Sequence, residues 1–198
     1  MKKVPLLALA LVAFTVSGCA QGTTNAPLAV PPPDGMLRTD GCATHTSPPA
    51  MTIDGTPQPA NQNDLAALAG RVQPYADAHF ADVYTGLELR SETDRIRVYR
   101  KPSAAFDAWI VKEFARDCVE VVDTAHNQRE LQALADRISA DMAYWQAQRL
   151  PINSVGASID GTVNVGTTEV DRARRELPQR YGTDIAIVVV FQGPIMPA

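Results

Sequence analysis

The most constraining feature of this sequence is a pattern of apolar residues that occurs twice. Within each half, apolar residues first recur at helical spacing and then alternate with polar ones, as in strands that bury one face. The helical positions match after a shift of 66 residues, and the strand positions match after a shift of 67. The matched positions are Leu65, Leu68, Val72, Ile96, Val98 and Val121 in the first half, and Leu131, Leu134, Ile138, Val163, Val165 and Val188 in the second. We therefore predict an internal duplication, with two unrelated halves as the alternative.

Both halves read as helix, strand, strand, helix, strand, which predicts an α+β fold of two tandem units with helices covering antiparallel sheets. The first half should contain helices over 63–80 and from residue 102, and strands over 84–90, 95–100 and 118–122. The second should contain helices over 131–150 and 168–182, capped by Thr168 and closed by Gly182, and strands over 152–159, 162–165 and 184–191. Pro74 and Pro178 should kink or shorten their helices. The nearly continuous apolarity of 184–191 predicts a central strand, and whether the two sheets join is left open.

The N-terminus carries an export signal. Lys2 and Lys3 precede an apolar run over residues 4–16, and small residues lead to Cys19. A positive start, a short apolar stretch and small residues before a cut are typical of a secretory signal peptide. The run is shorter than the roughly 20 residues that a spanning helix needs. Because a cysteine follows directly, residues 1–19 resemble a bacterial lipoprotein signal.

That resemblance implies a lipid anchor. In that family the signal, here residues 1–18, is cut off and the cysteine, here Cys19, carries the acyl chains. Two or more acyl chains hold a protein stably at a membrane surface. We therefore expect a lipoprotein at the extracytoplasmic face of the cell membrane. An ordinary cleaved signal peptide with a chance cysteine is the alternative.

A proline-rich segment, 19–62, follows the signal. It contains eight prolines and few apolar residues, so it is predicted to be a flexible tether. Two modules, 63–127 and 128–198, complete the predicted domain organisation. Cys42 lies in the tether and Cys118 begins a predicted strand. An exported protein meets an oxidising compartment, so these two cysteines are a candidate disulfide; a buried Cys118 and a free Cys42 are the alternative.

No motif for catalysis or metal binding accompanies the histidines. The histidines are His45, His79 and His126. The spacing of Asp77, His79 and Asp82 permits a metal site, but a solvated helix end is the simpler interpretation. Residues 166–168 precede a helix and could hold an anion, yet the acidic Glu169 favours plain capping. We predict no catalytic residue, no metal and no cofactor.

The remaining patterns point to packing and solvated surface. Aromatic residues at helical spacing are expected in the core: Phe106, Trp109, Phe114, Tyr144 and Trp145. Arginines near the last helix alternate with acidic residues, as on a solvated face: Arg172, Arg174, Arg175 and Arg180. A net charge of −4 and a pI near 5.3 argue against a nucleic-acid partner.

These observations favour a non-enzymatic binding module of the cell envelope with a protein partner. The hairpin–helix–strand order over 84–122 and 152–191 also resembles, by element order alone, the modules of secreted bacterial serine protease prodomains. That resemblance implies a folding chaperone or inhibitor of a protease, and a stand-alone inhibitor is one alternative function. A hydrolase with an unrecognised site is the other. The sequence leaves the oligomeric state open.

Overall fold

The computed structural model describes residues 36–45, 48 and 50–194. The predicted signal peptide and Cys19 lie outside the described residues. Helices pack on strands in an α+β arrangement with two separate hydrophobic cores. We call α1 to β6 (62–123) the first module and α3 to β9 (128–191) the second module.

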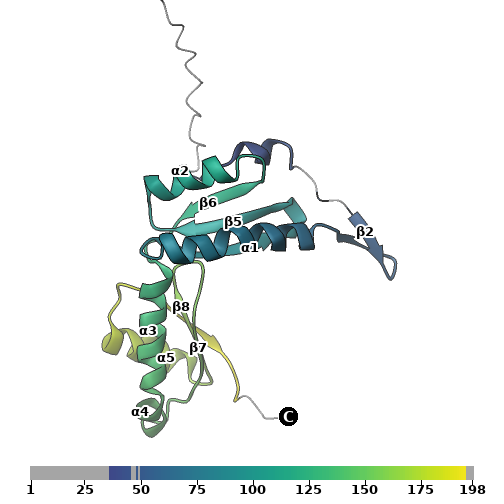
Figure 1. The fold of residues 1–198 in the computed structure, drawn as a ribbon. Coiled ribbons are helices and arrows are strands. Elements are labelled where there is room, and N and C mark those ends of the chain that lie inside the picture. The colour runs from purple at the N-terminus through teal and green to yellow at the C-terminus, as the bar shows by residue number, and fades with distance from the viewer. Residues whose placement is uncertain (1–35, 46–47, 49, 195–198) are drawn as a thin grey trace, which may run out of the picture. The chain divides into compact units, whose positions relative to one another are not determined.

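The first module begins with a long helix followed by a hairpin. Its elements are α1 (Gln62–His79), β4 (Tyr84–Arg90), β5 (Arg95–Arg100), α2 (Ala104–Glu113) and β6 (Val119–Asp123), with a 3-10 turn, η2 (Ser91–Thr93), between β4 and β5. Ser103 caps α2 by accepting a hydrogen bond from the backbone N–H of Phe106. Both helices bury an apolar stripe against the sheet (Figure 1).

The expectation of antiparallel sheets is wrong in one respect. β4 and β5 are antiparallel, but β5 and β6 are parallel. The reason is the crossover: α2 carries the chain back along the sheet, so β6 starts at the same end as β5. The sheet is therefore mixed.

Of the two effects expected of Pro74, a kink or a shorter helix, α1 does not show the second. The helix runs from Gln62 to His79 with Pro74 inside it. Pro74 and Gly70, whose carbonyl loses its hydrogen bond, both lie on the exposed side, where water solvates that carbonyl. Val72 and Ala76 on either side are fully buried, and their burial holds the helix together.

The second module repeats this pairing. Its elements are α3 (Gln128–Ala140), α4 (Met142–Ala147), β7 (Ile152–Ala157), β8 (Val163–Thr167), α5 (Val170–Tyr181) and β9 (Ile187–Phe191). β7 and β8 are antiparallel and β8 and β9 are parallel. The single helix expected over 131–150 is divided at Asp141, and α5 continues through Pro178 to Tyr181. The sheets of the two modules are separate.

Two expectations about the last strand are wrong. β9 is an edge strand of its sheet, not a central one. The register pairs Val98 with Val121 and Val165 with Val189, so the residue that matches Val121 is Val189 and not Val188. Because side chains alternate along a strand, this difference of one residue moves Val188 to the outer face.

The helix before β9 also starts differently from the prediction. Thr168 does not cap α5; its N-cap is Glu169, whose N–H donates to the buried Thr167 hydroxyl. That hydroxyl donates in turn to the Pro151 carbonyl. The helix ends as expected at Gly182, which has a positive φ of 90°.

Part of the predicted tether forms ordered elements. These are β1 (Leu37–Arg38), the 3-10 turn η1 (Asp40–Ala43), β2 (Ala50–Ile53) and β3 (Thr56–Pro59). β2 and β3 form an exposed two-stranded hairpin. β1 instead pairs antiparallel with β6 and becomes the fourth strand of the first module's sheet. Composition alone predicted a flexible tether because prolines lie between these short elements and, at Pro57 and Pro59, within β3 itself.

Candidate binding groove

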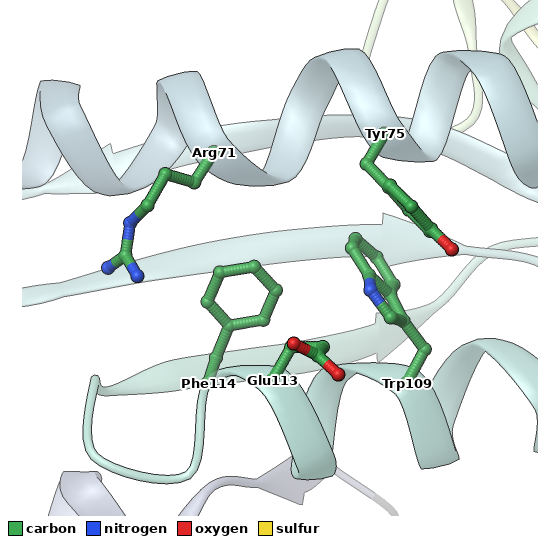
Figure 2. A pocket seen from close by; sticks show the side chains of 5 residues that line it. All are labelled: Arg71, Tyr75, Trp109, Glu113 and Phe114. Atoms are coloured by element: carbon green, nitrogen blue, oxygen red, sulfur yellow. The ribbon is translucent and has the colours of Figure 1, made fainter.

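The first module has a groove of about 380 Å³ between α1 and α2. Its lining is Arg71, Tyr75, Trp109, Glu113 and Phe114. Figure 2 shows Arg71 and Tyr75 reaching down from α1, with Trp109 and Glu113 on α2 and Phe114 directly after its end. The strands of the sheet run behind the two helices in this view.

Aromatic rings form one end of the groove. The rings of Tyr75 and Trp109 are stacked, with centroids 4.8 Å apart and an interplanar angle of 19°. Trp109 also packs edge-on against Phe106 and Phe114. Phe106 and Phe114 are buried in the core, whereas Tyr75 is 45% exposed. The core thus fixes Trp109, and Trp109 holds an exposed tyrosine ring in a defined orientation.

Arg71 forms the other end. Its guanidinium lies over the Phe114 ring, 5.4 Å from the centroid, and donates a hydrogen bond of 2.8 Å to Asp117. A cation over an aromatic face is stabilised by the ring quadrupole. The exposed Glu113 carboxylate lies between the two ends, and its ion-pair partner is Lys112 at 3.1 Å. The groove therefore offers aromatic surface bordered by one acidic group.

The second module has a hollow of similar size, about 360 Å³, in the corresponding place. It is lined by Arg137, Ala140, Asp141, Arg180 and Tyr181. Arg137 lies over the Tyr181 ring at 5.6 Å, which repeats the Arg71–Phe114 pair after shifts of 66 and 67 residues. The repeated pair supports the predicted duplication.

The chemistry of this second hollow is ionic. Asp141 accepts hydrogen bonds of 2.8 Å from both Arg180 and the Tyr181 hydroxyl. These two donors, Arg180 first, hold the pKa of Asp141 below its ordinary value. Arg180 also covers the Tyr144 ring, 4.0 Å from the centroid. The ionic groups here satisfy one another, whereas the first groove leaves an aromatic ring exposed.

The candidate cysteines come together. Cys42 and Cys118 form a disulfide with an S–S distance of 2.10 Å. The bond joins η1 to the start of β6, and Gly41 lies against the backbone of residues 116 and 117. The Thr39 hydroxyl donates to the Asp117 carbonyl and accepts from the Val119 N–H.

The three histidines contact different groups. His45 Nδ1 lies 2.8 Å from an Asp94 carboxylate oxygen, and the His79 ring packs on Tyr75. His126 Nε2 lies 2.9 Å from the Asp184 carbonyl. Among the described residues, no group of three His, Cys, Asp or Glu side chains is arranged to hold a metal ion. The structure does not bring Asp77, His79 and Asp82 together in such a group.

The exposed tyrosine of the groove is the residue that sequence reasoning missed. Tyr75 follows Val72 at helical spacing and so continues the apolar stripe of the helix, a pattern that is typical of a buried side chain. The aromatic residues expected in the core divide instead: Trp145 is buried, Trp109 is half-buried and Tyr144 is exposed. One sequence feature could have indicated the groove: Arg71 and Arg137 are 66 residues apart, so the same arginine recurs in both helices at matched positions.

A comparison with protein-family models and with curated proteins finds no match for this chain. Within the part of the chain that the structure describes, no helix combines the length and the apolar character that crossing a bilayer requires. The assignment of a function therefore depends on the groove, the disulfide and the N-terminal signal.

Proposed function

We propose that this protein is an exported, lipid-anchored binding module of the cell envelope that takes a protein partner in the groove between α1 and α2. The observation that carries this proposal is the stacked pair of Tyr75 and Trp109, which exposes an aromatic surface at the groove. Burying that ring against a partner gains the free energy that the monomer leaves unused.

The composition of the groove supports a protein partner. Tyrosine, tryptophan and arginine are the residues that most often dominate binding energy in protein interfaces. Here Tyr75, Trp109 and Arg71 line one groove. Tyr75 is held by the Trp109 ring, and Arg71 is held by Phe114 and Asp117. We expect the partner to place an apolar side chain on the rings and a basic group opposite the exposed Glu113 carboxylate.

The location follows from the disulfide and the signal. Disulfides persist in oxidising compartments, and the Cys42–Cys118 bond supports a site outside the cytoplasm. The lysines and apolar run before Cys19 support lipid attachment at that residue. The acyl chains on Cys19 would hold the groove near the outer face of the cell membrane.

Site-specific photo-crosslinking in the producing cells tests the groove. A photoreactive amino acid at position 75 should yield one discrete crosslinked protein, identified by mass spectrometry. The matched control is position 144, since Tyr144 is an exposed tyrosine of similar accessibility that also lies beside an arginine. Adding Trp109→Ala should reduce the crosslink from position 75 by about tenfold or more, because that variant removes the ring that orients the contact.

The groove proposal fails if positions 75 and 144 yield the same products, or if Trp109→Ala leaves the yield unchanged. Because Trp109 also contacts core rings, the melting temperature of the variant must be measured. A second test uses Glu113, whose side chain is exposed and lies outside the core. Glu113→Lys should also lower the crosslink yield from position 75, because a lysine there repels a basic group of the partner.

Mass spectrometry of the membrane-extracted protein tests the anchor separately. The expected N-terminal peptide begins at Cys19 and carries acyl chains. A Cys19→Ser variant should be released from the membrane fraction. An unmodified Cys19 thiol, on a protein that fractionates with the medium, would refute the anchor while leaving the groove proposal intact.

A further inference from the structure

β9 is an uncharged, apolar edge strand. Its sequence is Ile-Val-Val-Val-Phe, and three of its five side chains are exposed: Val188 at 41%, Val190 at 45% and Phe191 at 75%. An edge strand of this kind is a template for pairing with another chain, and proteins usually protect it with charge, proline or a covering segment. β9 contains neither charge nor proline. Figure 1 shows β9 in yellow beside β8.

The outer edge of β9 carries backbone hydrogen-bonding groups that do not pair with β8. The Val163 N–H donates to the Ala186 carbonyl, and the Gln192 N–H donates to the Thr167 carbonyl. In a parallel ladder these groups alternate, so the N–H and C=O groups of Ile187, Val189 and Phe191 point away from β8. Among them, the Val189 carbonyl accepts a 3.3 Å hydrogen bond from the exposed side chain of Arg174, and a strand that pairs with β9 has to replace that bond.

The first module shows how such an edge is covered. β6 occupies the place of β9, and its outer edge pairs antiparallel with β1: Leu37 lies opposite Val121 and Arg38 opposite Glu120. The Thr39 N–H donates to the Val119 carbonyl and extends this pairing. The cover belongs to the segment before α1 and is fastened by the disulfide.

The second module cannot be covered in the same way by its own preceding segment. Only residues 124–127 connect β6 to α3. They are engaged elsewhere: the Thr124 N–H donates to the Arg100 carbonyl, and the Asn127 side chain caps α3 and donates to the Asp82 carbonyl. Among the residues that the structure describes, the second module therefore has no intrachain strand on the edge that β1 covers in the first module.

We propose that β9 pairs antiparallel with β9 of a second copy of this chain, which makes the protein a two-fold symmetric dimer. With Val189 opposite its own copy, Val188 lies opposite Val190 of the partner copy and Ile187 lies opposite Phe191. Every cross-strand pair is then apolar, and the outward backbone groups of both strands are satisfied. A strand without charged side chains can pair with its own copy, because no like charges face each other across the two strands.

Photo-crosslinking of the full-length chain in membranes tests this dimer. A photoreactive residue at position 190 should give a crosslinked homodimer, whereas the same residue at position 111 should not. Val111 is the matched control because it is an exposed valine, 42% accessible, on α2 of the other module. The crosslinked peptide should join position 190 to residues 187–191 of the second copy.

A lysine on the same strand provides the second arm. Val188→Lys, combined with the probe at 190, should reduce the dimer about tenfold or more, since a tenfold loss corresponds to 1.4 kcal/mol and lysine on an edge strand opposes pairing. Val111→Lys should leave it unchanged. Val188 is exposed in the monomer, so the variant should fold, and an unchanged melting temperature of its monomer verifies this.

The inference is refuted if position 190 yields no homodimer, crosslinks within one chain to residues 1–35, or crosslinks to a different protein. It is also refuted if Val188→Lys leaves the homodimer yield unchanged. None of these outcomes bears on the groove between α1 and α2, because the two sites belong to different modules.

Discussion

The two modules share one topology but differ in how the last strand of each sheet is finished. In the first module, β6 is covered by β1 and tied to η1 by the disulfide. In the second module, the structure shows no strand on the outer edge of β9 among the described residues. The same arrangement of helices and strands thus occurs once with a further strand paired to the outer edge of its last strand and once, among the described residues, without such a strand.

The outer faces of the two sheets differ in the same sense. In the first module, the Glu120 carboxylate is 2% exposed and accepts hydrogen bonds from Arg38, Arg95 and Arg97. In the second module, Asn164 and Val188 pair at the positions that correspond to Arg97 and Glu120. This face carries no charged residue at Ser154, Gly166 or Val190 either. The core-facing side of each sheet therefore determines the fold that the modules share. The outer edge of the last strand and the outer face of the sheet determine what each module can contact.

Loss of the disulfide should have the largest effect on this comparison. Closing a loop between residues 76 apart stabilises by about 4 kcal/mol in the chain-entropy model. We expect Cys42→Ser with Cys118→Ser to lower the free energy of unfolding by up to that amount. Hydrogen exchange should accelerate at β6 amides and change little at β9 amides.

The internal control for this prediction is the second module. If exchange accelerates equally in β6 and β9, the modules unfold as one cooperative unit, and the disulfide and the β1–β6 pairing do not stabilise the first module alone. Adding a reductant to the wild-type chain should reproduce the double variant without altering the sequence.

The Glu120 cluster should have the next largest effect. Removing one partner of a buried ion pair costs about 3–5 kcal/mol. The three arginines are partly exposed, so solvent screening reduces the expected loss for Glu120→Gln to about 2–3 kcal/mol. Glu88→Gln serves as the control, because the Glu88 side chain lies on the same face but is far more exposed. Urea unfolding of both variants measures the difference.

The same cluster predicts a pH dependence. Burial disfavours the charged form of Glu120, but hydrogen bonds from Arg95 and Arg97 outweigh it and lower the pKa of the carboxyl group. A lowered pKa in the folded state stabilises the protein above the unfolded pKa of about 4.3, and this stabilisation is lost as the pH falls through the folded pKa. The free energy of unfolding should therefore fall below about pH 4.3, and less steeply in Glu120→Gln. Equal slopes would contradict the role of the cluster.

Much of this architecture could be predicted because buried positions recur with a period. Val72 and Ile138, or Val98 and Val165, identify the helices and strands of both modules from their spacing alone. The parallel pairing of β5 and β6 was missed because the alternation of side chains is the same in either direction. It depends on where α2 returns the chain.

The edge position of β9 was missed for a different reason. Continuous apolarity is typical of a central strand, and the sequence does not record whether a neighbour comes from the same chain. The pairing of β1 with β6 was not predicted, because the prolines before and after β1 indicated a flexible tether. The exposure of Tyr75 could not be predicted because it depends on the Trp109 ring, which occupies the space beside it.

Tight contact between η1 and the first module gives a fourth, smaller prediction. A Cβ atom on Gly41 would lie 2.4 Å from the Asp117 carbonyl oxygen, which is backbone and cannot rotate away. Gly41→Ala should therefore cost about 1–3 kcal/mol, as overpacking does. Gly70→Ala is the control, because a Cβ there meets nothing within 4 Å, and alanine favours a helix by about 1 kcal/mol.

Thermal unfolding should lower the melting temperature of Gly41→Ala and raise that of Gly70→Ala. A neutral Gly41→Ala would show that η1 does not dock tightly. The disulfide alone would then account for the closed edge of the first module.

The repeated cation–π pair gives the smallest expected effect and the closest test of equivalence. Arg71 lies over Phe114, and Arg137 lies over Tyr181, at centroid distances of 5.4 and 5.6 Å. Pairs of this kind contribute about 0.5–1 kcal/mol at exposed sites. Arg71→Gln should cost slightly more than Arg137→Gln, because Arg71 also donates a hydrogen bond to Asp117. Replacing Asp117 by Ala first removes the acceptor and should remove that excess, and the two arginine variants should then lose equal stability in urea unfolding. A difference that persists in the Asp117→Ala background would mean that the two grooves hold their arginines by different contacts, despite the shared positions in the fold.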